Sequence, residues 1–401
     1  MSTLWRAVAT KPWTCGACLV WLICLLALPV ASRAEMPEAA RLEDPGSKPL
    51  AEVLPAAEWK QVESSVDRAL VWLARKQAPD GSFPTLASGQ PAVTSLAVLA
   101  FLSRGHQPGL GPYGGQLERA IDNVLNCQRA DGLLCSGEIS TRLVLTTPSH
   151  TATYNHAIAG LMLGEVYGHV QGTRGARVKE AIQKALDFTR ALQTRPKELP
   201  ADKGGWRYLA LRFPHGASDS DLSVTSWQLM FLRSARNAEF EVPQEQIDEA
   251  LEYVMRCWKE DQGVFYYALS GPGDIRFSRS MVSAGILSLA LAGKHHTHVA
   301  LKAGDWLLRH PYQEFGELSG NCDRFFYGAY YYSQAAAQLG GRYWELLFPP
   351  LVTSLLSSQG KDGSWPPEPG PRDGIFGTCY TTSLAVLSLT PPYQLLPVYQ
   401  R

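Results

Sequence analysis

Two kinds of helical segment alternate from about residue 58 to the end of the chain. The first kind, such as VDRALVWLARKQ (66–77), has apolar residues at i, i+3, i+4 and i+7 with charges between, which predicts a helix with one buried face. The second kind, such as AVTSLAVLAFL (92–102), is apolar nearly all round and predicts a helix buried on every side. The amphipathic segments are 66–77, 117–128, 178–193, 246–258, 298–310 and 349–359, and the apolar segments are 92–102, 154–168, 223–235, 281–293, 327–341 and 380–389.

This alternation predicts an all-α fold with two concentric rings, an α/α toroid of six outer helices around six inner helices. A solenoid of the same helical hairpins is the alternative, but solenoid repeats are shorter and more regular. The connections are long and uneven, for example 194–222, and long loops on a rigid scaffold usually carry function. The pair Pro349-Pro350 predicts that the last amphipathic helix begins there.

Residues 1–34 predict a secretory signal peptide. Arg6 and Lys11 precede the apolar run 17–31, no acid precedes it, and small residues follow, so we expect cleavage after Ala34. The protein is then exported to the periplasm or the extracellular space. The alternative is an uncleaved segment that anchors the protein beside a membrane.

Two further regions follow the signal peptide. Residues 35–57 are rich in Pro, Ala and Glu and predict a linker, and residues 58–401 predict the toroid domain. The chain has 37 basic and 37 acidic residues, a balance that excludes the basic excess usual in nucleic-acid binders. With 45% hydrophobic and 18% charged residues, the chain is of the core-forming and not the disordered class.

Eight cysteines become five once the signal peptide is removed. An odd number means that at least one thiol stays free or pairs between chains, and the sequence leaves the pairing open. The five are Cys127, Cys135, Cys257, Cys322 and Cys379, of which the first two are close enough in sequence to bridge. Neither CxxC nor HxxxH spacing occurs after the signal peptide, so we expect no metal site and no cofactor.

A turn motif recurs where the helices of a pair join. It reads QAPDGSF at 77–83 and QGKDGSW at 359–365, with weaker copies at 128–133, 204–206 and 261–265. Asp-Gly forms a tight turn with the glycine in a left-handed conformation, the Gln closes the outer helix, and the aromatic residue packs back on its end. The motif is therefore structural and not catalytic.

This pattern resembles the QW repeat of squalene/hopene cyclases and of the β subunits of protein prenyltransferases, over residues 58–401. The segments YNHAIAG, DLSVTSWQLMFLRSA and TCYTTSLAVLSL look like those of secreted bacterial proteins with prenyltransferase/squalene-oxidase repeats. The resemblance implies the α/α toroid of the terpenoid cyclases and protein prenyltransferases.

The resemblance also implies candidate catalytic acids. Class II terpene cyclases use a DxDD motif whose protonated middle Asp is the proton donor, and the nearest match here places Asp219 and Asp221 at the first and middle positions. Leu222 replaces the last Asp, so the anionic partner is missing. The alternative is that Asp221 or Ser223 caps the helix that follows.

The zinc ligands of the protein prenyltransferases are replaced. Where the resemblance places their Asp, Cys and His, this chain has Tyr327, Ala329 and Gly377. A zinc-dependent prenyltransferase activity is therefore not expected.

Aromatic residues are the candidates for the cavity lining. Tyr327, Tyr330 and Tyr331 share one face of the fifth apolar helix. The others are Tyr154, Trp206, Tyr208 and Trp227, with His156 as an acid/base or hydrogen-bond partner of Asp221. Such rings stabilise carbocations, stack on sugars or fill the toroid, and because each buried tyrosine hydroxyl needs a partner they favour a polar-aromatic cleft.

Three functions remain open. The first is an exported toroid that binds a peptide, a glycan or a hydrophobic molecule in its central cavity or mouth. The second is a terpene cyclase- or isomerase-like enzyme that acts on an isoprenoid with Asp221 as general acid. The third is a polysaccharide-active toroid with paired carboxylates, for which Asp274, Asp323 and Asp373 are candidates.

Overall fold

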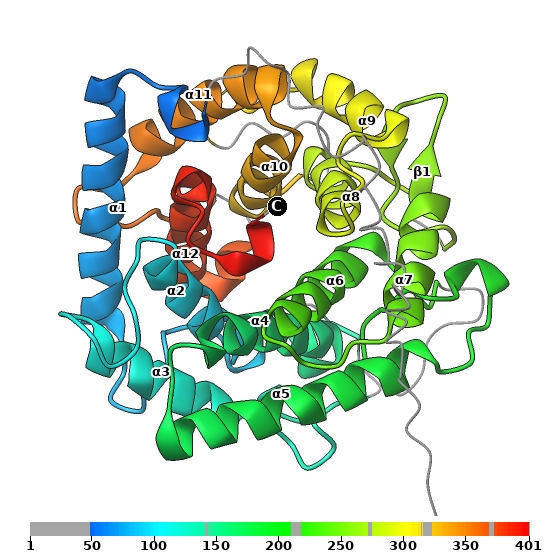
Figure 1. The fold of residues 1–401 in the computed structure, drawn as a ribbon, viewed down its shortest axis with the longest axis horizontal. Helices are drawn as coiled ribbons and strands as arrows, with labels where there is room; N and C mark the ends of the chain where they lie inside the picture. Colours follow the sequence, from blue (N-terminus) through cyan, green and yellow to red (C-terminus); the bar gives the residue numbers. More distant parts are fainter. Residues whose placement is uncertain are drawn as a thin grey trace, which may run out of the picture. The chain divides into compact units, whose positions relative to one another are not determined.

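The described part of the chain is almost entirely helical and forms two concentric rings (Figure 1). The structure is a computed structural model that describes residues 49–140, 143–144, 146–209, 218–271, 275–313, 315, 323–368 and 373–400. Within these residues the outer helices are α1 (Ala56–Lys76), α3 (Gly114–Asn126), α5 (Gly172–Gln193), α7 (Gln244–Cys257), α9 (His298–Leu308) and α11 (Gly341–Ser358). The inner helices are α2 (Ala92–Leu102), α4 (Pro148–Tyr167), α6 (Leu222–Asn237), α8 (Arg279–Leu291), α10 (Phe325–Leu339) and α12 (Gly377–Leu389).

The inner ring is closed. Each inner helix packs against the next along the chain, and α12 packs against α2. The predicted all-α toroid of six helix pairs is therefore confirmed. One two-stranded antiparallel ribbon interrupts the helices of the described part, with Trp258 of β1 (Trp258–Lys259) opposite Phe265 of β2 (Val264–Phe265).

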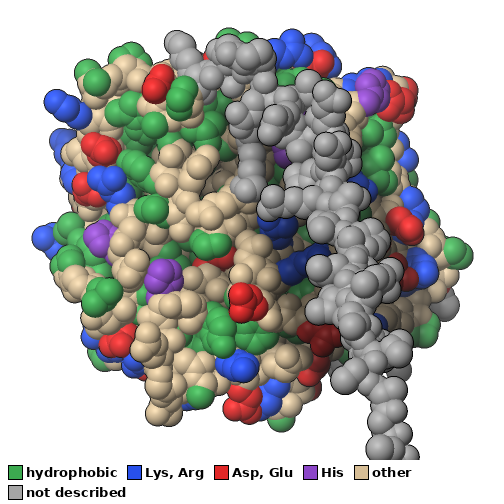
Figure 2. Space-filling view, viewed as in Figure 1, with side chains coloured by type: hydrophobic (Ala, Val, Ile, Leu, Met, Phe, Trp, Pro, Cys, Tyr) green, Lys and Arg blue, Asp and Glu red, His purple; other side chains and the backbone are tan. Residues whose placement is uncertain are grey.

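Burial follows the hydrophobic pattern. Every residue of α2 is buried, whereas α1 buries one face, which includes Val62, Val66 and Leu73. On the face shown in Figure 2, charged side chains of both signs lie mainly around the periphery, over the outer helices. The outer ring thus separates the apolar inner ring from water, as the two kinds of helical segment predict.

The start of α11 differs from the prediction. The helix begins at Gly341, and Pro349 and Pro350 lie inside it. The apolar face that precedes the prolines explains the extension, because the ring of Trp344 stacks on Phe348 with 3.9 Å between centroids. Packing of this face outweighs the local cost of proline within a helix.

The end of the predicted linker folds onto the toroid. Residues Leu50–Glu52 form a short 3-10 helix, and the indole Nε1 of Trp344 donates a hydrogen bond of 3.0 Å to the Leu50 carbonyl. The predicted signal peptide, residues 1–34, lies outside the described residues. Across the part of the chain that is described, no helix has both the length and the apolar character needed to cross a bilayer.

Four glutamines join neighbouring outer helices. In each case the side-chain Nε2 donates to a glycine carbonyl in the turn that follows its own helix and to a carbonyl of another outer helix. The four sets are Gln77 with Gly81 and Gln116, Gln128 with Gly132 and Ala181, Gln193 with Gly204 and Gln246, and Gln359 with Gly363 and Ser65. The last set links α11 to α1 and so helps to close the outer ring.

Candidate functional site

A cavity of about 940 Å³, counting the open space at its mouth, lies at the amino ends of the inner helices. Every inner helix contributes residues from its first turns, so six helix N-termini, each with partial positive charge, face one space. The described lining is Gly89, Ala92, Val93, His150, Thr151, Tyr154, Asn155, Ile158, Tyr208, Ser223, Trp227, Tyr267, Arg276, Ser278, Ser280, Met281, Arg324, Tyr327, Phe376 and Tyr380.

One wall of the cavity is a group of aromatic rings. The His150 ring lies 4.1 Å from the Tyr208 ring, and the Tyr154 ring lies 6.1 Å from Tyr208, measured between centroids. The hydroxyls of Tyr208 and Tyr267 are hydrogen-bonded to each other. These residues come from α4 and from the loops before α6 and α8, which are distant in sequence.

A chain of hydroxyl groups crosses the cavity floor. The Tyr154 hydroxyl donates to Ser223 Oγ at 2.9 Å, and Ser223 Oγ lies 2.6 Å from the hydroxyl of Tyr327. The Trp227 indole donates to the same Tyr327 oxygen at 3.2 Å. The network ties α4, α6 and α10 together and gives the cavity aromatic rings whose polar edges are hydrogen-bonded.

Three arginines supply positive charge at the site. Arg276 and Arg324 line the cavity, and the guanidinium of Arg276 lies 4.3 Å from the centroid of the Tyr267 ring. Arg207 lies behind the same wall, where its guanidinium faces the rings of Tyr208 and Tyr267 at 4.9 and 5.5 Å. None of the described lining residues is Asp or Glu.

His150, Tyr154 and Tyr267 in the lining are uncharged near neutral pH. Burial, together with the positive charges of Arg324 and Arg207, lowers the pKa of His150 to about 4. Burial raises the pKa of Tyr154 and of Tyr267 well above the ordinary value near 10. The hydroxyls therefore serve as neutral hydrogen-bonding groups, and neutral His150 can accept a hydrogen bond.

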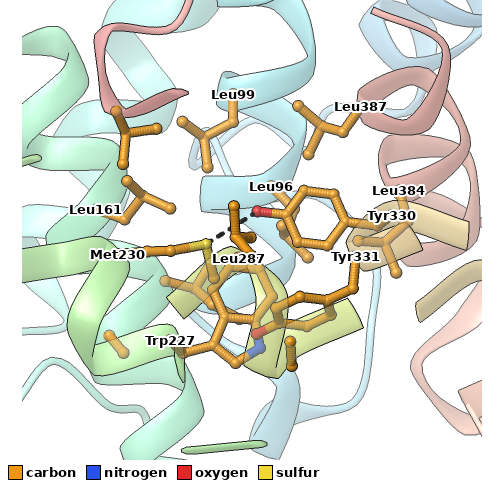
Figure 3. Close-up of a cluster of buried hydrophobic side chains, with 14 of the residues drawn as sticks. Leu96, Leu99, Leu161, Trp227, Met230, Leu287, Tyr330, Tyr331, Leu384 and Leu387 are labelled. Carbon is orange, nitrogen blue, oxygen red and sulfur yellow. Dashed lines mark hydrogen bonds between the residues drawn. The ribbon is translucent and has the colours of Figure 1, made fainter. Parts of the chain in front are cut away.

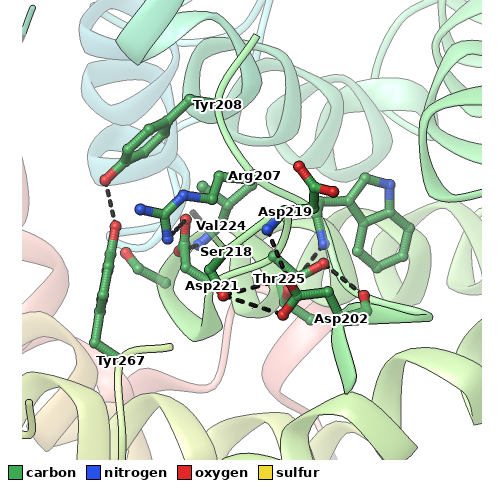
Figure 4. Close-up of polar contacts among 12 residues, drawn as sticks. Asp202, Arg207, Tyr208, Ser218, Asp219, Asp221, Val224, Thr225 and Tyr267 are labelled. Atoms are coloured by element: carbon green, nitrogen blue, oxygen red, sulfur yellow. Dashed lines mark hydrogen bonds and ion pairs between the residues drawn. The ribbon is translucent and has the colours of Figure 1, made fainter. Parts of the chain in front are cut away.

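Asp221 is not in the cavity lining. It lies behind the aromatic wall, on the far side of Arg207 from Tyr208 and Tyr267 (Figure 4). It is the N-cap of α6, where its Oδ1 accepts a hydrogen bond of 2.7 Å from the Val224 N–H. Its Oδ2 lies 3.6 Å from Nη1 of Arg207. The structure therefore shows Asp221 as the capping residue of α6, which is the second of the two roles considered for it.

Asp219 lies apart from the cavity on the same segment. Its Oδ2 accepts a hydrogen bond of 2.8 Å from the Glu198 N–H, and its own N–H donates to the buried carboxylate of Asp202 at 2.6 Å. These contacts hold the loop before α6 in place. The catalytic roles of Asp219 and Asp221 stay predictions.

Three predicted lining residues, Tyr330, Tyr331 and Trp206, are buried in the core instead, and Figure 3 shows the two tyrosines. The rings of Trp227 and Tyr330 stack with 5.3 Å between centroids, and the hydroxyl of Tyr331 lies 2.8 Å from Ser226 Oγ. Neither Tyr330 nor Tyr331 lines the cavity, whereas Tyr327, one turn earlier on α10, does. Trp206 is also fully buried, and its indole donates to the Thr189 carbonyl at 2.9 Å.

His156 is not brought to Asp221. Its Nδ1 accepts a hydrogen bond of 3.2 Å from the Leu134 N–H, and its Nε2 lies 2.9 Å from the hydroxyl of Thr189. The histidine is fully buried and does not line the cavity. The predicted acid/base or hydrogen-bond contact between His156 and Asp221 is therefore not among the contacts of His156 in this structure.

His150, Tyr267, Arg276 and Arg324 line the cavity although the sequence pattern did not predict them. His150 precedes Tyr154 by one helical turn in PSHTATYNH, so the i, i+4 spacing was a usable signal. Tyr267 and Arg276 lie in an irregular segment before α8, and no helical pattern marks them. Arg324 directly precedes α10. Because the amino ends of the inner helices all face the cavity, a residue at this position lies at the cavity mouth.

The described residues contain no group of three His, Cys, Asp or Glu side chains that could hold a metal ion. The thiols of Cys127, Cys135, Cys257 and Cys379 are free in the structure, and Cys322 lies outside the described residues. Of the three acids considered for a paired-carboxylate site, Asp274 also lies outside them. Asp323 accepts a hydrogen bond from Arg279 Nε at 2.9 Å and is not among the described lining residues.

No family model matches the chain, and no curated protein sequence matches it. Solved structures share its fold. A variant of the type II terpene cyclase MstE from Scytonema, in complex with the substrate geranylgeranyl dihydroxybenzoate, is 14% identical with a TM-score of 0.54, and the match covers 86% of this chain and 100% of that one. A family 76 α-mannanase from Bacteroides thetaiotaomicron is 11% identical with a TM-score of 0.56, and covers 83% and 96%. At these identities the likeness shows the α/α toroid fold alone.

Proposed function

We propose that this protein binds a small ring-bearing molecule in the cavity at the amino ends of the inner helices. The observation that carries the proposal is the lining itself, in which aromatic faces alternate with hydroxyl groups. Tyr154 and Tyr327 contribute aromatic rings to the lining, and their hydroxyls are joined through Ser223, while the Trp227 indole donates to the Tyr327 oxygen. Such a surface suits a sugar ring or an aromatic ring better than an extended peptide.

Export is part of the proposal. The signal peptide predicted over residues 1–34 would place the ligand in the periplasm or outside the cell. The toroids of similar fold include a terpene cyclase in complex with geranylgeranyl dihydroxybenzoate and an α-mannanase, which supports a ligand that is isoprenoid-aromatic or a glycan.

Binding is favoured over the two catalytic alternatives by the position of the acids. Asp221 caps α6 and faces Arg207 beneath the wall, so it would have to cross that wall to protonate a ligand. A glycosidase needs two carboxyl groups on either side of the scissile bond, and the described lining contains no carboxylate. A cyclase with Asp221 as general acid and a glycan-cleaving enzyme remain the alternatives.

The test is a comparison of two neighbouring tyrosines on α10. We expect Tyr327→Phe to weaken binding of the probes 2-naphthamide or cellobiose by roughly fivefold, because one hydrogen bond to the ligand is worth about 1 kcal/mol. Tyr331→Phe is the matched control, because the Tyr331 hydroxyl bonds Ser226 inside the core. Affinities are measured by saturation-transfer NMR and calorimetry. Equal loss in both variants, or no binding of any ring-bearing probe, neutral or acidic, would contradict the proposed function.

A further inference from the structure

Cys127 and Cys135 face each other across a tight antiparallel turn. The Cys135 N–H donates to the Cys127 carbonyl at 3.2 Å, and the next two residues inward, Gln128 and Leu134, form an antiparallel bridge. The Cα atoms of such an opposed, hydrogen-bonded pair lie about 5.5 Å apart. A disulfide joins residues whose Cα atoms are roughly 4.4–6.8 Å apart. The backbone therefore holds the two cysteines at a separation that a disulfide can span.

The two thiols also lie close together on this turn. The Sγ of Cys127 lies 3.4 Å from the hydroxyl oxygen of Ser136, and the Sγ of Cys135 donates to the Ser136 carbonyl at 3.4 Å. Burial, and to a smaller extent the nearby Cys127 thiol, raises the pKa of Cys135 to about 11. Both thiols are free in the structure, so joining them requires rotation of the two side chains while the paired backbone stays in place.

Cys127 is the accessible member of the pair. Its side chain is only partly buried, whereas Cys135 is buried, so an oxidant reaches Cys127 first. Two other described cysteines, Cys257 of α7 and Cys379 of α12, are buried and lie on different sides of the double ring (Figure 1). Among the described cysteines, the pair on the turn is therefore the one arranged for a bridge.

The segment that begins at Cys135 connects the outer ring to the cavity end of the inner helices. The Ser136 N–H donates to the Gln90 carbonyl at 3.2 Å, just before α2, and the Ser140 N–H donates to Ser149 Oγ at 2.8 Å in the first turn of α4. Both helices contribute residues of their first turns to the cavity lining. A covalent link at the start of this segment would fix it to the end of α3.

We propose that Cys127 and Cys135 form an intramolecular disulfide that closes this turn. The oxidant is itself a disulfide, either a small one such as oxidised glutathione or that of a thiol oxidoreductase. The Cys127 thiolate attacks it and one reduced thiol leaves, and the Cys135 thiolate then displaces the second thiol from the mixed disulfide. The two cysteines lose two electrons and two protons, which the released thiols carry away. Export, as proposed above, would supply an oxidising compartment, and the bridge does not depend on what the cavity binds.

Trypsin can separate the two cysteines, because Arg129 lies between them. The reduced protein gives the peptides 120–129 and 130–142 as separate species, whereas the bridged protein gives one linked species that dithiothreitol divides. Burial raises the pKa of the Cys127 thiol, so the predicted mature protein is incubated with excess oxidised glutathione at about pH 8.5, where more thiolate is present. We expect mass spectrometry to find the linked species in most molecules.

Thermal unfolding measures what the bridge contributes to stability. A disulfide restricts the unfolded chain, so the oxidised wild type should unfold a few degrees above the reduced wild type. Cys127→Ser should unfold at the same temperature under both conditions and give no linked peptides. Cys257→Ser is the matched control, because it removes a buried thiol away from the turn, and it should keep both the linked peptides and the shift in unfolding temperature.

The peptide map can overturn the proposal in two ways. If 120–129 and 130–142 stay separate in excess oxidant, with each cysteine free or joined to glutathione, the bridge is wrong. If either peptide is instead joined to that of a different cysteine, the pairing is wrong. A bridged wild type that unfolds no higher than the reduced protein would contradict the closing of the turn as a stabilising feature. Ring binding in the cavity is a separate proposal and stands or falls on its own test.

Discussion

The Nδ1 atom of His156 accepts a hydrogen bond from the backbone N–H of Leu134 at 3.2 Å. Three threonine hydroxyls occupy the same position in other repeats and accept from the corresponding turn. The pairs are Thr94 with Phe83, Thr225 with Trp206, and Thr382 with Trp365. His156 therefore takes the place of a repeated threonine that satisfies a buried backbone donor.

This relationship predicts that a threonine can replace His156. His156→Thr keeps an acceptor near the Leu134 N–H, and we expect the ligand affinity to change by less than twofold. His156→Ala leaves that buried N–H unsatisfied and should lower the free energy of unfolding by about 1–3 kcal/mol. Urea denaturation of both variants is the measurement. A full loss of function in a stably folded His156→Thr would instead support the acid/base role.

The same substitution has a pH signature. Burial lowers the pKa of His156 from 6.5 to about 4, so the unfolded chain binds a proton that the folded chain does not between these values. Its contribution to stability is complete above pH 6.5 and is lost as the pH falls towards 4. Relative to His156→Thr, the wild type should lose up to about 3 kcal/mol over that range. If the difference in free energy of unfolding between the wild type and His156→Thr did not change with pH, a buried neutral His156 with a lowered pKa would be contradicted.

We expect substitution of Asp221 to lower the stability of the fold, because its carboxylate caps α6 and lies opposite Arg207. Asp221→Ala removes the cap of α6 and leaves the buried guanidinium of Arg207 without this carboxylate. We expect a loss of about 3–5 kcal/mol in the free energy of unfolding, as for other broken buried ion pairs. The exposed Asp261→Ala is the control and should change little. A stable Asp221→Ala protein that has lost a catalytic turnover would favour the cyclase alternative.

Much of the fold could be predicted because ring position is a property of single helices. An all-apolar helix such as α2 has to be inside, and an amphipathic one such as α1 has to be outside, whatever the neighbours are. The predicted start of α11 at Pro349-Pro350 was wrong. Two prolines are a local signal, and the packing of Trp344 on Phe348 outweighs it.

The site was harder to predict because its members meet only in three dimensions. Tyr327 and Tyr330 are three residues apart on one helical face, yet the first lines the cavity and the second lies in the core, since depth along the toroid axis separates them. Residues such as Tyr267 and Arg276 come from a loop without periodicity. Sequence patterns indicate which face of a helix is buried, but not how far below the mouth a residue lies.

The turn glycines provide a test of how closely the outer helices approach. Gly81 has a φ of 87°, and a Cβ there would collide with the Arg119 carbonyl on α3. An alanine in a left-handed conformation lowers the free energy of unfolding by roughly 1 kcal/mol. Gly81→Ala should lower it by well over that amount, because the collision adds to the strain. Gly172→Ala is the matched control, because its φ of 61° is also positive but no atom lies within 4 Å of the added Cβ. Thermal unfolding of both variants compares them, and equal losses would contradict the close approach.

Glu165 holds the end of the chain at the opposite end of the inner ring from the cavity. Its Oε2 accepts from the Val398 N–H at 3.3 Å, and its Oε1 accepts from Ser234 Oγ at 2.5 Å. Nearby, the hydroxyl of Tyr399 is hydrogen-bonded to that of Tyr330, so the last residues cover the core of the ring. Burial raises the pKa of Glu165 from 4.5 to about 7, so the folded protein favours the neutral acid.

Glu165→Gln imitates that neutral acid and should make the protein more stable than the wild type at high pH. The amide can donate to Ser234, whose hydroxyl also has the Leu161 carbonyl as acceptor, while the amide oxygen accepts from Val398. In the wild type, the contribution of Glu165 is present below pH 4.5 and is lost as the pH rises through 7. Relative to the Gln variant, the wild type should lose up to about 3 kcal/mol between pH 4.5 and 8, measured by urea denaturation. The exposed Glu245→Gln is the control and should show no such trend. A wild type that gains stability over the variant as the pH rises would mean that the carboxylate form is the one the folded chain prefers.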